Sequence, residues 1–340
     1  MMPDPTLTLQ YTDLVNAISR QQGLGDTFSS LDATNQARVD FAVQSGYRYF
    51  LYHPQIGGRV HRWSFLRPTT SITVWGTLDG QLFGAPSYSL ITLKSTLTIK
   101  TGGDVFYPSC EGQTINLTNA VGVTTGYVIT DYLTSTTVKV NGDLSALYAA
   151  DNVWAISSSG NFLMPSNYGA IEGTFTFGAT TGYLALSIVG ENQIRDLRQT
   201  GTSGGLPQHV AIIPVANDGT VAQRFWLQVW PTPDSAYALT YRYHAMMHKL
   251  SAGAPYPLGG AQHSQTVLAS CMAQAELLFN DEKGIHWDRY MELLAASVQM
   301  DLTDHAPEKL GYNSDNSDGE CSYPWRGRAS SLYYGSSKLW

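Results

Sequence analysis

The sequence has little charge and no long apolar run. Charged residues make up 14% of its 340 residues, against roughly 25% in ordinary soluble proteins. No stretch approaches the roughly 18 consecutive apolar residues that cross a bilayer, so we expect no membrane association. The segment from Met1 to Leu9 lacks the basic and apolar parts of a signal peptide, and we expect none. Such a weakly charged surface suits burial against partners, because few charges need desolvating.

Cysteine is also scarce. Cys110, Cys271 and Cys321 are odd in number and far apart, which excludes a disulfide framework and a zinc site. Cys271 falls on the apolar stripe of an expected helix, so we interpret it as a small buried hydrophobic residue. A reducing compartment during folding fits this pattern best.

Positive charge is too thinly spread for a nucleic-acid-binding face. The 20 Lys and Arg residues are scattered, and the net charge is −7. Proteins that hold nucleic acid by its phosphates need a basic face. We therefore expect no tight DNA binding, although DNA can slide past such a surface without adhering.

Several motifs of the common enzyme classes are absent: the sequence has no Walker A, G-x-G-x-x-G or H-E-x-x-H. His244 and His248 have helical metal-ligand spacing, but they follow an expected strand and lack a nearby acidic residue. His286, Trp287 and Asp288 begin an expected helix, where Trp287 packs and Asp288 stabilises the helix N-terminus.

Acidic residues also form no recognisable site. Asp315, Asp318 and Glu320 do not have the spacing of an EF-hand loop. No carboxylate pair stands out as a general acid and base, and pairing in space stays open. We expect no enzyme activity, no metal and no cofactor.

Helical patterns occur at both ends of the chain. The first covers residues 12–22, and a second begins after Asp32 and ends at Gly46. Two more cover about 262–280 and 286–301, joined by a short turn as an antiparallel pair. Two further expectations concern the second helix and the segment that follows it. Ala37, Phe41 and Ala42 are expected to face inward, and Tyr47, Tyr49, Phe50 and Tyr52 to lead out as an extended segment.

The sequence between the helices predicts β structure. Asp79-Gly80 and Asn141-Gly142 are predicted turns. Short strand patterns within 101–165 recur at the spacing of a small barrel or sandwich. Apolar residues alternate before and after the turn at 231–234, from Phe225 to Val229 and from Tyr237 to Tyr243, which predicts an aromatic hairpin.

These patterns predict an α+β fold: a discontinuous bundle of two N-terminal and two C-terminal helices, a large antiparallel β insertion and an extended C-terminal arm. The expected parts are a helical module at 1–55 and 258–305, a β core at 56–100 and 166–257, a small barrel-like or sandwich-like insertion at 101–165, and the arm at 306–340.

The arm is rich in aromatic residues and nearly free of aliphatic ones, so it cannot bury itself alone. Trp, Tyr and Arg commonly anchor interfaces. We expect this segment to become ordered on a partner; the alternative is a disordered or self-packed end. The candidate anchors are Tyr323, Trp325, Arg326, Arg328, Tyr333, Tyr334 and Trp340.

In the order of these parts the chain resembles head-to-tail connector proteins of tailed bacteriophages, in particular adaptors similar to tail tubular protein A. Three segments carry the resemblance: ARVDFAVQSGYRYFLYHP (37–54), LQVWPTPDSAYALTYRYH (227–244) and HSQTVLASCMAQAELLFNDEKGIHWDRYMELLAASVQMD (263–301). The pattern covers about half the chain, and no single motif is diagnostic. The β insertion at 101–165 departs from the smallest members of the family.

The resemblance implies a ring of identical subunits, usually twelve, beneath the portal protein in the virion neck, assembled in the bacterial host cytoplasm. DNA passes through its lumen, which an acidic wall favours. The arm reaches the portal, and the β insertion meets a downstream tail or nozzle protein, or fibres. Two alternatives stay open: another tail or fibre-attachment protein, and a β-rich polysaccharide hydrolase, which needs a carboxylate pair in a cleft.

Overall fold

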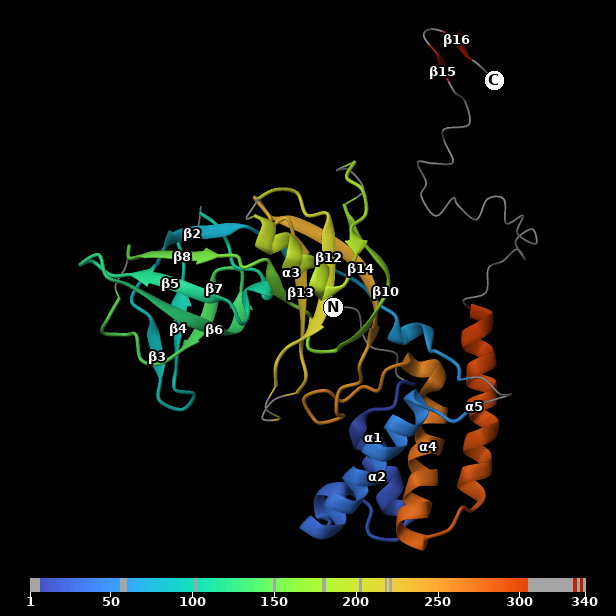
Figure 1. Ribbon diagram of the computed structural model, residues 1–340. Coiled ribbons are helices and arrows are strands. Elements are labelled where there is room, and N and C mark those ends of the chain that lie inside the picture. The colour runs from blue at the N-terminus through green and yellow to red at the C-terminus, as the bar shows by residue number, and fades with distance from the viewer. Residues whose placement is uncertain are drawn as a thin grey trace.

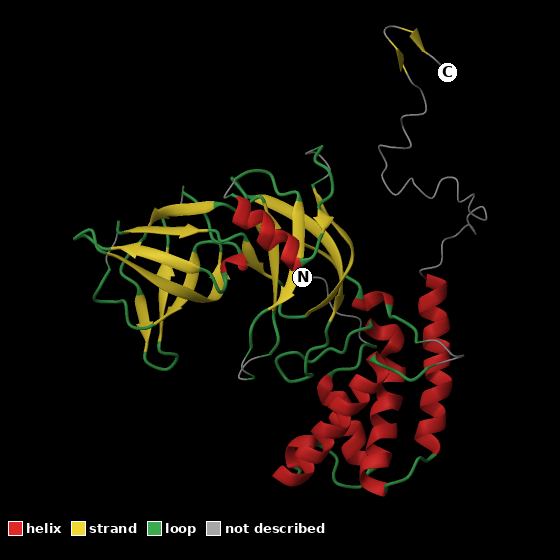
Figure 2. Ribbon diagram, viewed as in Figure 1, coloured by secondary structure: helices red, strands yellow, loops and turns green. Residues whose placement is uncertain are grey.

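A computed structural model gives the three-dimensional structure, in which α1, α2, α4 and α5 gather at one end and the β-sheets, with α3 beside them, at the other (Figures 1 and 2). Helices at both ends of the chain enclose a large, mostly antiparallel β region, which confirms the predicted α+β class. The structure describes residues 7–55, 60–100, 103–148, 151–178, 182–201, 204–217, 219 and 222–304, and the backbone of 333–334 and 337–338.

Four helices form the helical module: α1 (Tyr11–Gln21), α2 (Ala33–Leu51), α4 (Gly260–Asn280) and α5 (Ile285–Asp304). α2 packs against α4, α4 packs against α5, and α1 contacts both α2 and α4. The module also includes the short 3₁₀ turns η1 (Phe28–Ser30) and η2 (Ser64–Leu66). Helices from the two ends of the chain thus share one core. Its fully buried residues include Leu14, Ile18, Val39, Tyr47, Phe50, Trp63, Cys271, Tyr290 and Leu294.

α2 is longer than predicted, because it continues through Gly46 to Leu51. Tyr47 and Phe50 are therefore buried helical residues, and the predicted extended segment is wrong. Gly46 marks the point where α2 crosses α4: a Cβ atom there would lie 2.4 Å from the Cα atom of Cys271. A close helix contact, and not a helix end, explains this glycine.

The inward face of α2 also differs from the prediction. Ala42 is buried, as expected, but Ala37 is exposed and Phe41 is 62% exposed. The buried residues Val39, Ala42 and Gly46 recur at helical spacing on the side that meets α4, and Phe41 falls off this stripe.

The β-barrel is one antiparallel sheet with the strand order β2-β8-β5-β6-β7-β4-β3. A bridge between Leu82 and Ile99, just beyond β2 and β4, joins the two sides of the sheet. The 3₁₀ turn η3 (Pro108–Cys110) precedes β5. The strands are β2 (Thr77–Gln81), β3 (Ser87–Ser89), β4 (Lys94–Thr98), β5 (Thr114–Thr118), β6 (Thr124–Thr134), β7 (Thr137–Asn141) and β8 (Val153–Ser157).

The barrel begins earlier than the predicted 101–165 insertion, because β2, β3 and β4 belong to it. Asp79-Gly80 lies inside β2, paired with β8, so the predicted turn there is wrong. Gly80 makes a tight contact here, since the Trp154 indole would lie 3.1 Å from a Cβ atom of residue 80. At Asn141-Gly142 the chain does leave β7, and Gly142 has a φ of +95°.

Two further sheets form the β-sandwich, and their buried residues form one core with those of the barrel. The first sheet has the order β1-β14-β10 and the second β11-β12-β13-β9. Helix α3 (Glu191–Thr200), which was not predicted, packs on β12 and β13. The strands are β1 (Thr69–Val74), β9 (Asn161–Leu163), β10 (Tyr168–Phe177), β11 (Ser187–Ile188), β12 (His209–Pro214), β13 (Phe225–Trp230) and β14 (Tyr237–Ala245).

The predicted aromatic hairpin is wrong, because β13 and β14 lie in different sheets. β13 pairs with β12 and β9, whereas β14 pairs with β1 and β10. The alternation was nevertheless informative, since Leu227, Val229, Leu239 and Tyr241 are all buried in the shared core. Alternation identifies the buried face of a strand, but the neighbouring sequence does not determine which strand pairs with it.

Candidate functional site

The predicted docking residues fall largely outside the described residues. Two of them, Tyr333 and Tyr334, make up strand β15 (Tyr333–Tyr334), whose backbone pairs with that of β16 (Ser337–Lys338). The other arm residues (Tyr323, Trp325, Arg326, Arg328 and Trp340), the acidic group Asp315, Asp318 and Glu320, and Cys321 lie outside the residues that the structure describes.

The histidines singled out in the sequence do not come together as a site. His244 lies within β14 and His248 follows that strand, so the pair does not share a helix face. At the start of α5, the backbone N–H of His286 donates to Glu276, and the ring of Trp287 lies 5.4 Å from that of Tyr49. Among the described residues, no group of three His, Cys, Asp or Glu side chains has a metal-binding arrangement.

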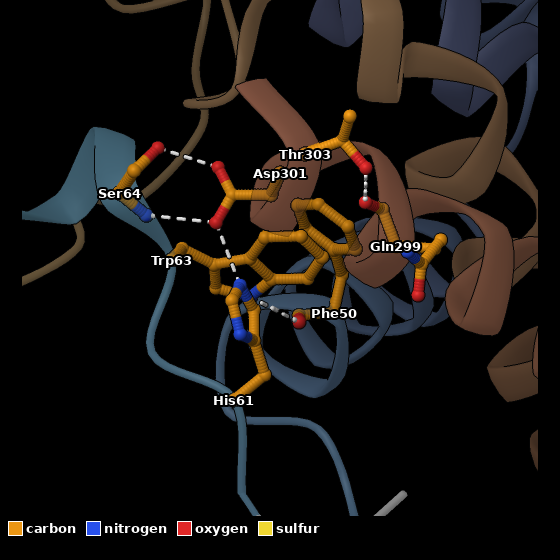
Figure 3. A network of polar contacts seen from close by, with 7 residues as sticks. All are labelled: Phe50, His61, Trp63, Ser64, Gln299, Asp301 and Thr303. Atoms are coloured by element: carbon orange, nitrogen blue, oxygen red, sulfur yellow. Dashed lines mark hydrogen bonds and ion pairs between the residues drawn. The ribbon is translucent and has the colours of Figure 1, made fainter. Parts of the chain in front are cut away.

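A polar network that the sequence did not reveal centres on Asp301, near the end of α5 (Figure 3). Its Oδ2 atom lies 2.6 Å from His61 Nε2 and accepts the Ser64 backbone N–H at 3.1 Å. Its Oδ1 atom accepts the Ser64 hydroxyl at 2.5 Å. The Asp301 side chain is only 3% exposed. These contacts join α5 to the segment that leads from α2 into the β region.

The environment of Asp301 favours its charged form. Burial by itself raises the pKa of this carboxyl, but the hydrogen bonds from Ser64 and His61 and the charge of His61 outweigh it and lower the pKa. Beside the network, the indole N–H of Trp63 donates to the Phe50 carbonyl at 3.2 Å.

Although Ser64, His61 and Asp301 have the residue types of a hydrolase triad, their order in space is wrong for one. In a triad the histidine lies between the serine, whose proton it takes, and the aspartate. Here the aspartate lies between the other two. The arrangement therefore stabilises the attachment of the connecting segment to α5 and does not activate a serine.

A cleft of about 670 Å³ lies where the barrel meets the sandwich. Glu111 and Asp131 both line it, so two carboxylates do share a cleft. Each has a cationic partner: Lys94 Nζ is 2.6 Å from Asp131 Oδ2, and Arg224 is 3.7 Å from Glu111. The hydrogen bond from Lys94 lowers the pKa of Asp131, against the effect of burial. A glycosidase needs one carboxyl with a raised pKa as its acid, and Asp131 does not supply it.

A predominantly apolar groove of about 680 Å³ runs along the outer side of α2. Within it, the Asp40 carboxylate lies 3.0 Å from Lys249 and accepts the Tyr11 hydroxyl at 2.8 Å. The charge of Asp40 is thus balanced by Lys249 of the same chain. Arg48, which also lines the groove, has an exposed side chain. The residues that line the groove are Ala37, Asp40, Phe41, Gln44, Arg48, Tyr52, Met246, Met247 and Lys249. We call this surface the α2 groove.

Sequence reasoning missed the α2 groove because it placed Phe41 in the core. A signal was present: Ala37, Phe41, Gln44, Arg48 and Tyr52 recur at helical spacing and define a second face. That face contains one phenylalanine, one tyrosine and one arginine, residue types common at interfaces.

None of the helices within the described residues has the length and apolarity that a membrane span requires. No protein-family model matches the chain, and a search of curated proteins finds no match either.

Proposed function

We propose that this chain is a structural protein of a bacteriophage particle: a neck adaptor whose identical copies, twelve in the usual arrangement, form a ring that joins the portal to the tail. DNA passes through the ring without specific binding. The protein is not an enzyme and needs no cofactor. It assembles in the host cytoplasm and functions in the virion.

One observation carries this proposal. The four helices contributed by both ends of the chain form a single bundle with its own core, and the β region projects from it (Figure 2). The Asp301 network and the Trp63–Phe50 hydrogen bond hold the outgoing connection against that bundle. A rigid bundle bearing a separate β projection suits a subunit whose bundles build a wall while its β parts meet other proteins.

The net charge and an exposed apolar surface also support the proposal. A net charge of −7 on each copy repels phosphates, so a ring of such copies lets DNA slide through. The exposed apolar residues of the α2 groove suit burial against another protein.

The segment 306–340 is proposed to dock on the portal protein. Deletion of residues 321–340 is expected to abolish docking, because it removes all seven candidate anchors. Co-sedimentation with purified portal rings measures docking. The thermal unfolding midpoint serves as the control for folding, because it should match that of the full chain. Unchanged docking of the shortened chain would contradict the proposed role of the arm.

Cryo-electron microscopy of the particle that contains the protein tests the function directly. The expected result is a ring of this chain between portal and tail, with its C-terminal segment running into the portal. A position further along the tail would identify a tail or fibre-attachment protein instead. Absence from the particle would refute the structural role.

A further inference from the structure

The outer surfaces of α2 and α5 lie on opposite sides of α4, and neither is covered within the described part of the chain. In Figure 1, α4 lies between α2 and α5. α2 meets α4 through Gly46, and α5 packs on α4 through its own buried stripe. The face of α2 away from α4 forms the α2 groove.

The outer face of α5 also follows helical spacing. Ile285 is 76% exposed, and Asp288, Glu292 and Ala296 continue the same face with exposed side chains. Its buried side, by contrast, contains Tyr290 and other core residues of the module. We call this surface the α5 face.

The two surfaces match in sequence spacing. Phe41, Gln44 and Arg48 lie on α2 and Tyr52 directly follows it, at steps of three, four and four residues. Ile285, Asp288, Glu292 and Ala296 lie on α5 at the same steps. Laid side by side in parallel, they pair an apolar residue with an apolar one, an arginine with a glutamate, and a tyrosine with an alanine. The Gln44 amide, opposite Asp288, keeps its hydrogen bonds to Asp40 and Leu250 of its own copy.

We propose that the α2 groove of one copy binds the α5 face of the next copy in this parallel register, with Arg48 opposite Glu292 of the neighbouring copy. Arg48 suits this role because the carboxylate in its own groove, Asp40, already has Lys249 as its partner. This inference rests on the proposed function, since it specifies the contact that builds the ring.

The direction of the helices agrees with a ring. α2 runs antiparallel to α4, because Arg38 stacks over Phe279 near one end of the pair and Gly46 meets Cys271 further along. α4 in turn runs antiparallel to α5, so α2 and α5 of one copy are parallel. Successive subunits of a ring with many members differ by a small rotation. The α5 of a neighbour therefore stays nearly parallel to α2.

The heights of the two helices along the bundle also agree with the proposed register. Within one copy, the Tyr290 hydroxyl donates to the Tyr49 carbonyl at 3.0 Å, so these two residues lie at similar heights along the bundle. The proposed register places Glu292 of the next copy beside Arg48. The heights of the two surfaces along the bundle therefore differ by only a few residues, so the contact needs only a small shift of the neighbour along the helix direction. Contact between two different surfaces closes into a ring when the rotation permits, whereas a twofold dimer would bury one surface against itself.

Cysteine cross-linking in assembled particles tests this contact. The background variant is Cys321→Ser; Cys110 and Cys271 are buried and remain. Arg48→Cys and Glu292→Cys are introduced together, and a short bis-maleimide reagent is added. The expected result is a ladder of covalent multimers on a denaturing gel, and neither single variant should give one. The matched control pairs Arg48→Cys with Thr303→Cys, which lies about 16 Å further along α5, and should give no ladder.

Each other outcome overturns the inference. Dimers from Arg48→Cys alone would indicate that α2 meets α2 of another copy. Particles that show a ring by microscopy but no ladder from the paired variant would place another segment or protein in the α2 groove. Particles without a ring of this chain would instead refute the proposed function, so the two failures differ.

A charge exchange gives a second measurement that does not depend on cysteine chemistry. Arg48→Glu and Glu292→Arg are each expected to lower the number of copies incorporated per particle, because each brings like charges together. The double variant with both changes is expected to restore incorporation. Both residues are exposed, so the unfolding midpoint should stay unchanged in all three variants. Failure of the double variant to recover would contradict the Arg48–Glu292 register.

Discussion

The Asp301 side chain connects α5 with the segment that contains His61 and Ser64. Its carboxylate accepts from the Ser64 hydroxyl, from the Ser64 backbone and from His61, across more than two hundred residues of sequence. All three groups belong to the segment that connects the helical module with the β region. The loss of this carboxylate therefore weakens the attachment of the connecting segment to α5.

At the residue scale, Asp301→Asn is expected to lower the free energy of unfolding by about 1–3 kcal/mol at pH 7, because buried donors lose a charged acceptor. The folded pKa of Asp301 is lowered, so its contribution is complete above the unfolded value of about 3.9. It disappears as pH falls through the folded pKa.

Urea unfolding of both proteins at pH 7 and at several values below pH 4 checks this prediction. The difference between wild type and Asp301→Asn should shrink toward acid pH. A difference that stays constant across that range would show that the ionised carboxylate is not the source of the stability.

At the element scale, the crossing of α2 and α4 depends on the absence of a side chain at Gly46. A methyl group there would lie 2.4 Å from Cys271 Cα and 2.9 Å from the Ser270 carbonyl oxygen, both in backbone. Gly46→Ala is expected to destabilise the protein by about 1–3 kcal/mol or more, because the helices must separate. The thermal unfolding midpoint measures this.

Gly84→Ala is the matched control, because no atom lies within 4 Å of the added Cβ position. Its effect is expected to stay within about 0.5 kcal/mol. Equal midpoints for the two alanine variants would contradict the close contact at Gly46.

The attachment of α3 depends on one arginine. Arg198 donates to the carbonyl of Gly160 at 3.0 Å, to that of Val229 at 3.2 Å and to the Asn161 side chain at 2.9 Å. Arg198→Ala is expected to cost about 1.5–3 kcal/mol, the range for hydrogen bonds to charged groups. Chemical denaturation measures the loss.

Arg195 on the same helix is the control, since its side chain is 69% exposed and its ion pair with Glu191, at 3.5 Å, lies at the surface. Arg195→Ala should change stability by less than about 1 kcal/mol. A similar loss for both variants would contradict the assigned role of the Arg198 hydrogen bonds.

At the scale of the whole molecule, the net charge determines how strongly the protein can bind DNA. With a net charge of −7, the protein is expected to bind duplex DNA more weakly than roughly 10⁻⁴ M at physiological salt, the weak end of non-specific binding. Fluorescence anisotropy of labelled duplex measures this, with a basic DNA-binding protein as the positive control. Micromolar binding that weakens steeply with salt would contradict a passive lumen.

Much of the architecture was predictable because secondary structure and burial leave local patterns. The four helices at the chain ends lie close to their predicted positions, and Cys271 is buried as predicted. A small β unit is present, but it begins earlier than predicted because β2, β3 and β4 belong to it. Helix α3 was missed, since it is short and only Ile194 among its residues is buried. The role of the C-terminal arm stays a prediction.

The sequence by itself determined that helices at both chain ends enclose a β region, because apolar periodicity is a property of neighbouring residues. Tertiary structure alone decided that β13 and β14 enter different sheets, that Gly46 lies at a helix crossing and that Asp301 meets Ser64. The physical reason is the same in each case: these contacts depend on which distant surfaces meet, and a local pattern shows a buried face without showing what covers it.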